Sequence, residues 1–113
     1  MAIRRGEIYQ VNLDPTIGSE MKKSRPAVVV SADSINKASS VVVVCPIIDS
    51  FGKSSPIHIE VPEGEGGLTK DSVVHCGQFR SVDIQRLGER LGELDRHIMA
   101  KVSKGLRDAL GLW

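Results

Sequence analysis

Two uninterrupted apolar runs constrain the fold of this chain more than any other feature of its sequence. Residues 26–31 are apolar up to a closing serine, and residues 41–48 open with four consecutive valines. An apolar run of about four to eight residues is typical of a strand that is buried on both faces. We therefore predict two central strands, the second about 26 Å long if it is fully extended.

Less hydrophobic segments around these runs predict the remaining strands. Each of them alternates apolar and polar residues or is bounded by turn residues, as short strands are. Gly88 and Gly92 make the last of them either a strand or an irregular arm. The segments are residues 7–13, 57–61, 72–78 and 87–94.

The C-terminal part of the chain changes to a helical period. After Asp95, a suitable N-cap, apolar residues recur at helical spacing: Ile98, Val102, Leu106 and Leu110. Gly105 weakens this helix but does not end it. A shorter helical turn, capped by Asp33, is expected at residues 33–38.

The complete pattern predicts one mainly β domain that spans residues 1–113. Five or six short, mostly antiparallel strands closed by a C-terminal helix make a small barrel or a strongly curved sheet. Residues 62–70 contain three glycines and predict a long mobile loop. A length of 113 residues fits a single domain.

Composition excludes several classes of protein. Lys plus Arg is 15 and Asp plus Glu is 14, so a strongly basic nucleic-acid binder is excluded, whereas a local basic site is not. No apolar run approaches the roughly 18 residues of a membrane span, and the N-terminus lacks the apolar core of a signal peptide. Cys45 and Cys76 lie in strand-like runs without disulfide or metal spacing, so we expect buried free thiols and a cytoplasmic protein.

The segment GSEMKKSRP, residues 18–26, places three cations in a loop directly before a buried strand. Arg25 precedes Pro26, which favours an extended backbone and places the arginine at the mouth of the strand. A guanidinium there can bind a phosphate through two parallel hydrogen bonds. The alternative is a surface arginine paired with Glu20 or Asp14, and the residues alone do not favour either interpretation.

His75 is the second candidate for chemistry. A period of two places Val73, His75 and Gly77 on one face, where the glycine would leave open space over the imidazole. An unperturbed pKa near ~6.5 suits proton transfer at neutral pH. The alternative is a half-exposed strand histidine. His58 is expected to face solvent, and His97 to lie on the surface.

The segment Gln78-Phe79-Arg80 is the third candidate. A polar, an aromatic and a cationic side chain at a strand end can stack on a base and hydrogen-bond to it. The segment can equally be a turn with Phe79 in the core and Arg80 paired with Asp83.

The order and spacing of several motifs over nearly the whole chain resemble the MazF/PemK toxins. The closing helix also fits that pattern. The motifs are Arg5-Gly6-Glu7-Ile8-Tyr9, Leu13-Asp14-Pro15, Gly18-Ser19-Glu20, Arg25-Pro26, Cys45-Pro46-Ile47 and residues 73–83.

The resemblance implies an endoribonuclease of a toxin–antitoxin pair. Such toxins fold as a curved antiparallel SH3-like barrel related to CcdB, form homodimers, and cut single-stranded RNA without a metal or other cofactor. A cognate antitoxin covers the RNA groove, DNA is contacted only through the antitoxin, and no membrane is involved. The ribose 2′-OH attacks the adjacent phosphate and leaves 2′,3′-cyclic phosphate and 5′-OH ends.

The same resemblance assigns the site residues. The catalytic set is Arg25, His75 and Ser19. The residues expected to bind RNA are Glu20, Lys22, Lys23, Asp49, Ser50, Lys53, Gln78 and Arg80.

Departures from the family pattern keep two further hypotheses open. Many members carry a threonine at Ile48, and Ser50 or Asp49 is the expected substitute. In the Kid branch the position of His75 is arginine and that of Gly77 is aspartate, so this chain keeps a protonatable group but lacks the carboxylate. Ile48 thus favours a degenerate toxin that binds RNA or antitoxin without cutting. The terminal Leu112-Trp113 suggests a CcdB-like gyrase poison, against which the conjunction of Arg25 with His75 argues.

Overall fold

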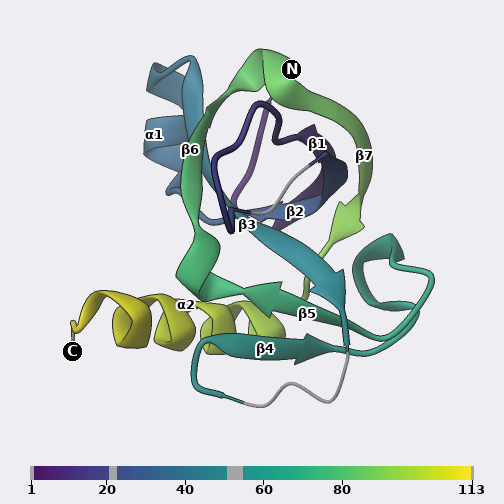
Figure 1. The fold of residues 1–113 in the computed structure, drawn as a ribbon. Coiled ribbons are helices and arrows are strands. Elements are labelled where there is room, and N and C mark those ends of the chain that lie inside the picture. The colour runs from purple at the N-terminus through teal and green to yellow at the C-terminus, as the bar shows by residue number, and fades with distance from the viewer. Residues whose placement is uncertain (1, 21–22, 51–54, 113) are drawn as a thin grey trace.

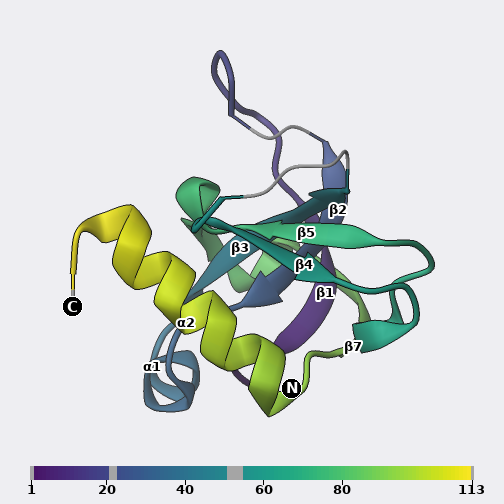
Figure 2. The same cartoon turned by 90° about the horizontal axis from the view of Figure 1, so that it is seen from below.

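The computed structural model describes residues 2–20, 23–50 and 55–112, which form a bent seven-stranded antiparallel sheet with a C-terminal helix along one side (Figures 1 and 2). The mainly β fold predicted from the sequence is confirmed, with seven strands rather than five or six. None of the helices in the described ranges is long and apolar enough to cross a membrane. The strands are β1 (Glu7–Asn12), β2 (Ser24–Val29), β3 (Val41–Asp49), β4 (His58–Val61), β5 (Ser72–His75), β6 (Arg80–Asp83) and β7 (Leu87–Glu93). The helices are α1 (Asp33–Ala38) and α2 (Arg96–Leu110), with 3-10 turns η1 (Glu65–Gly67), η2 (Cys76–Gln78) and η3 (Ile84–Arg86).

Strand β3 is the longest described strand and pairs with three others in succession. Its first residues lie opposite β6, its middle opposite β2, and its last three residues, beginning at Ile47, opposite β5. Strand β1 connects β2 to β7, and β4 extends β5. The sheet therefore has a barrel-like part, formed by β1, β2, β3, β6 and β7, and an arm formed by β3, β5 and β4 (Figure 1).

The core divides into two clusters because successive side chains of a strand point to opposite faces. One cluster lies beneath α2 and includes Ile8, Val28, Cys45, Val74 and Val102. The other belongs to the barrel-like part and includes Tyr9, Val11, Ala27, Val29 and Val44. Burial on both faces of β2 and β3 confirms the prediction from the two apolar runs.

Helix α2 packs closely on the sheet. It begins after Asp95, whose Oδ1 accepts a hydrogen bond from the Ile98 amide at 2.8 Å, which confirms the predicted N-cap. Gly105 is buried, and a Cβ there would lie 2.8 Å from Cys76 Sγ and 3.2 Å from the Pro56 carbonyl. The glycine therefore permits a close approach that a larger residue would prevent.

Two local predictions are wrong. The strand expected at residues 72–78 ends at His75, where the chain turns into η2. Asp33 does not cap α1, because its Oδ1 accepts a hydrogen bond from the Arg5 amide at 2.7 Å instead. The loop expected at residues 62–70 contains the 3-10 turn η1 and packs directly against β7, where a Cβ on Gly67 would lie 2.0 Å from the Leu91 carbonyl.

A buried carboxylate joins β1 to β7. Glu7 is only 7% exposed, and it accepts hydrogen bonds from Arg90 Nε and the Arg4 amide, both at 2.7 Å, and from the Tyr9 hydroxyl at 3.1 Å. Burial alone would raise the pKa of the Glu7 carboxyl, but these hydrogen bonds outweigh burial and hold the pKa below its usual value.

Replacing Glu7 should cost stability in a way that depends on pH. Because its pKa is lower in the folded chain than in the unfolded one, ionised Glu7 stabilises the fold above the unfolded pKa. This contribution disappears as pH falls through the folded value. We predict that Glu7→Gln lowers the free energy of unfolding by about 1–3 kcal/mol at neutral pH, and by less below about pH 4. Urea unfolding at neutral pH and below about pH 4 measures the loss of stability. Glu89→Gln, at an exposed position of β7, is the control. Equal losses at the two pH values would contradict the role of the charge.

Candidate functional site

Arg25 and His75 lie on the same face of the sheet, although they come from different strands. Directly opposite residues in antiparallel strands share a face, and so do residues two apart on one strand. Ala27 on β2 lies opposite Pro46 on β3, and Ile48 on β3 lies opposite Val73 on β5. Arg25 lies two residues before Ala27, Ile48 lies two residues after Pro46, and His75 lies two residues after Val73, so all six residues share one face.

This face is the one opposite α2. Cys45 and Val74 are adjacent in sequence to residues of this face, so their side chains point to the other face, and they belong to the cluster that packs against the helix. Arg25 is half-buried on β2, directly opposite Val11, and its extended backbone confirms the prediction made from Pro26. A half-buried guanidinium at a strand end can bind an anion while the strand holds its direction.

His75 ends β5 and is enclosed by its neighbours. A Cβ on Gly77 would lie 3.0 Å from His75 Cε1 and 2.9 Å from Ile57 Cδ1. The open space expected over the imidazole is therefore absent on this side. The reason is that Gly77 lies in η2 and not on the strand, so the turn brings its backbone against the ring.

His58 was expected to face solvent, and this prediction is wrong. It lies directly opposite His75 in the pairing of β4 with β5, and the two ring centroids are 4.5 Å apart in an edge-to-face arrangement. Its Nδ1 lies 2.5 Å from the Ser55 hydroxyl oxygen. The alternation of residues 57–61 predicted that His58 lies on the polar face of its strand. Only the register with β5 shows that His75 lies beside it on the same face. His97 is exposed, as expected.

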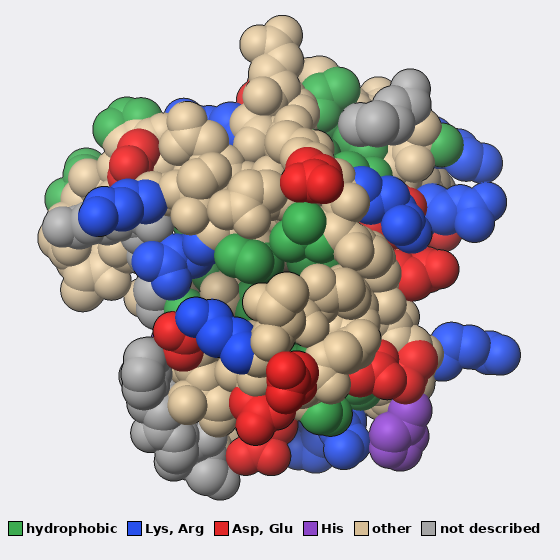
Figure 3. All heavy atoms as spheres, turned by 90° about the vertical axis from the view of Figure 1, so that its right-hand side faces the viewer, with side chains coloured by type: hydrophobic (Ala, Val, Ile, Leu, Met, Phe, Trp, Pro, Cys, Tyr) green, Lys and Arg blue, Asp and Glu red, His purple; other side chains and the backbone are tan. Residues whose placement is uncertain are grey.

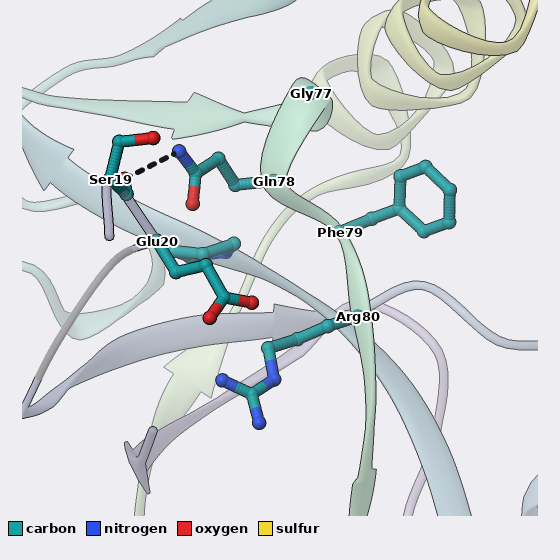
Figure 4. Close-up of a pocket in the computed structure, with 7 residues that line it drawn as sticks. Ser19, Glu20, Gly77, Gln78, Phe79 and Arg80 are labelled. Carbon is teal, nitrogen blue, oxygen red and sulfur yellow. Dashed lines mark hydrogen bonds between the residues drawn. The ribbon is translucent and has the colours of Figure 1, made fainter. Parts of the chain in front are cut away.

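A pocket of about 250 Å³ lies beside the turn that follows His75 (Figure 4). Gln78 Nε2 donates a hydrogen bond to the Ser19 carbonyl at 3.3 Å and thereby joins two segments that are far apart in sequence. The Ile17 amide donates to Glu20 Oε1 at 2.5 Å, which fixes the loop side of the pocket. The lining residues are Ser19, Glu20, Pro46, Gly77, Gln78, Phe79 and Arg80.

The turn that follows His75 presents polar groups to this pocket. Arg80 Nη1 donates to the Leu13 carbonyl at 3.0 Å, while Asp83 accepts from the Gln85 amide. Phe79 is 36% exposed, with its ring pointing away from Ser19 in Figure 4. The alternative of a core Phe79 and an Arg80–Asp83 ion pair is therefore wrong, whereas base stacking by this segment stays a prediction.

Two other predicted site residues gather at the end of β3. Asp49 forms an ion pair with Lys70 at 2.8 Å, which leaves both side chains substantially exposed. Ser50 lines a second pocket of about 270 Å³ together with Glu60 and Asp71. Because Glu60 lies opposite Val73, this pocket borders the face that carries His75.

The predicted basic residues are only partly described. Lys22 and Lys53 lie outside the described residues. Lys23 is exposed, and its backbone amide donates to Asp14 Oδ1 at 3.0 Å. On the side of the molecule shown in Figure 3, acidic and basic side chains are interspersed, as a net charge of +1 would suggest.

The thiols belong to the opposite face. Cys45 and Cys76 are both free and buried, as predicted, and Cys76 Sγ contacts the Val102 carbonyl of α2 at 3.7 Å. A hydrogen bond with Cys76 and burial together raise the pKa of Cys45. Within residues 2–20, 23–50 and 55–112, no group of three or more His, Cys, Asp or Glu is arranged to hold a metal ion.

Comparison with known proteins identifies the family of this chain. Residues 4–110 match the model of a family described as PemK-like, MazF-like toxin of type II toxin–antitoxin systems. The chain is 40% identical over 111 residues to endoribonuclease MazF of Staphylococcus epidermidis, covering 97% of this chain and 92% of the relative. It is 34% identical over 113 residues to endoribonuclease EndoA of Bacillus subtilis, covering 99% and 97%.

Solved structures share the fold. The crystal structure of MazF from Deinococcus radiodurans superimposes with a TM-score of 0.84 at 28% identity, covering 99% of both chains. An endoribonuclease in complex with its cognate antitoxin from a mycobacterial species has a TM-score of 0.82 at 24% identity, covering 99% of this chain and 98% of that one. With most of its length matched by the family model and by two curated relatives, this chain belongs to the PemK-like, MazF-like toxins of type II toxin–antitoxin systems.

Proposed function

We propose that this toxin cuts single-stranded RNA on the sheet face that carries Arg25 and His75. The chain is an endoribonuclease, as its family and the two relatives named above indicate. The observation that carries the proposal is the strand register, which aligns Arg25 and His75 on one face beside a polar pocket.

The reaction proposed for this face uses the RNA's own nucleophile. The ribose 2′ oxygen attacks the adjacent phosphorus and loses its proton, while the bond to the 5′ oxygen breaks and that oxygen gains a proton. His75 takes part in this proton transfer, since imidazole titrates near neutral pH. Arg25 stabilises the charge that develops on the phosphorane oxygens. The products are a 2′,3′-cyclic phosphate and a 5′-OH.

The pocket beside His75 is proposed to hold a nucleotide next to the cut. Carboxylate, amide and guanidinium groups from Glu20, Gln78 and Arg80 can hydrogen-bond to base edges or phosphate. Ser19 lies on the rim, where its backbone is already fixed by Gln78. Asp49 and Ser50 are proposed to contact RNA further along the same face, and the lysines Lys22, Lys23 and Lys53 to attract its backbone.

The toxin is further proposed to act as a cytoplasmic homodimer that a cognate antitoxin inhibits. A solved complex of a protein with the same fold and its antitoxin supports the partner. An apolar groove at the C-terminal end of α2, with Leu110 and Leu112 more than half exposed, supports self-association.

The ends of the RNA fragments test the proposed function. We predict that purified toxin cuts a long RNA in excess chelator and leaves 2′,3′-cyclic phosphate and 5′-OH ends, because the nucleophile and the charged groups suffice. Sequencing of the fragment ends, with and without chelator, measures both properties. Cleavage that stops in chelator and returns with magnesium, or that leaves 5′-phosphates, would refute the mechanism.

Arg25 should be essential for the rate. We predict that Arg25→Ala lowers single-turnover cleavage about 10²–10³-fold, the usual loss for one donor to a developing oxyanion. Arg25→Lys should remain strongly impaired, since lysine keeps the charge but lacks the planar fork. Arg96→Lys, at an exposed position of α2, is the matched control. Near-parental cleavage by Arg25→Ala would place the catalytic group elsewhere.

Ile48 distinguishes an active enzyme from a degenerate one, the second candidate function. Ile48 is half-buried on the site face, and Ser50 follows two residues later beside Glu60. If Ser50 makes the phosphate contact that isoleucine cannot make, Ile48→Thr should change the cleavage rate by less than about threefold, well below the usual effect of a catalytic donor. Ser50→Ala should lower it. A gain of orders of magnitude in Ile48→Thr would identify the parent chain as degenerate.

A further inference from the structure

We propose that His58 is a positioning residue that holds the imidazole of His75 in the orientation needed for proton transfer. The inference rests on the proposed function of His75 and adds a residue that neither the sequence motifs nor that function includes. Its basis is the geometry of the paired rings.

The imidazole of His75 has two close neighbours. The ring of His58 meets it edge to face, with centroids 4.5 Å apart and planes inclined by 60°. The backbone of Gly77 also lies so close that a Cβ would come within 3.0 Å of His75 Cε1. A ring with two such neighbours has little freedom to rotate.

His58 is itself held in place. The Ser55 hydroxyl lies 2.5 Å from His58 Nδ1, and backbone pairing of β4 with β5 places His58 directly opposite His75. His58 Nε2 is buried, and it makes no conventional hydrogen bond within the described part of the chain. His75 Nδ1 is buried as well, so the burial of these nitrogens does not distinguish the two rings. We assign His58 the positioning role because it lies directly opposite His75 and Ser55 holds it there.

The consequence concerns geometry at the reacting atoms. A proton acceptor or donor works only when its nitrogen points at the proton to be moved, and small misplacements reduce rates strongly. Without the ring of His58, the imidazole of His75 can swing into the space that the ring leaves. The rate then falls, whereas the affinity for RNA does not.

Single-turnover cleavage at saturating RNA, together with RNA binding and thermal melting, tests this role. We expect His58→Ala to lower the cleavage rate about 10-fold or more while the Kd for RNA changes by less than about twofold. His58→Phe, which keeps an aromatic ring in the same place, should recover most of the rate. His97→Ala, at the exposed histidine of α2, is the matched control and should cleave normally.

A double-mutant cycle separates this inference from the proposed function. In a His75→Gln background, His58→Ala should cause no further loss, because the two residues act through one ring. If His75→Gln is impaired but His58→Ala cleaves at the parental rate, the positioning role is wrong and the proposed function stands. If His75→Gln cleaves normally, the proposed function fails as well. Should His58→Ala unfold, His58→Gln removes the ring while keeping a polar side chain, and a parental rate in that variant would overturn the inference.

Discussion

The pairing of β3 with β2 and β5 is the interaction on which the rest of the site depends. Arg25 and His75 belong to strands that do not pair with each other, and β3 lies between them. Because the two ladders fix which residues lie opposite one another, they also fix that both side chains leave the same face. A slip of one residue in either ladder would send one of the two side chains to the face beneath α2.

The two faces of the sheet have different roles: one packs against α2, and the other carries Arg25 and His75. Helix α2 covers one face so closely that Gly105 has no room for a side chain beside Cys76, and this face contributes packing. The other face is apolar inside the barrel-like part and becomes polar where β2 begins and β5 ends. The hydrogen-bonded Glu7 joins β1 to β7 and so helps to hold the edge of the barrel-like part together. A site at the end of rigid strands can direct a guanidinium and an imidazole at one phosphate.

Periodicity and motif order predicted six of the seven described strands, the C-terminal helix and the family, because apolar alternation and the Asp95 cap are local signals. Strand β6 was not predicted. They could not predict contacts that depend on register. His58 was assigned to solvent because its partner strand was unknown, and Gly77 was placed on β5 because a 3-10 turn leaves no clear mark in a short segment. The contact of Gln78 with Ser19 likewise joins two segments that only the fold brings together.

The central claim is that RNA binds the face that carries both Arg25 and His75. Side-chain NMR spectra recorded during titration with an oligonucleotide that has a 2′-deoxy nucleotide at the cut site test this directly, because such an RNA analogue binds but offers no nucleophile. We predict that the Arg25 guanidinium and His75 imidazole signals shift together and saturate at the same concentration, while the His97 signals remain unchanged. Saturable shifts on α2, with Arg25 and His75 unaffected, would contradict the account.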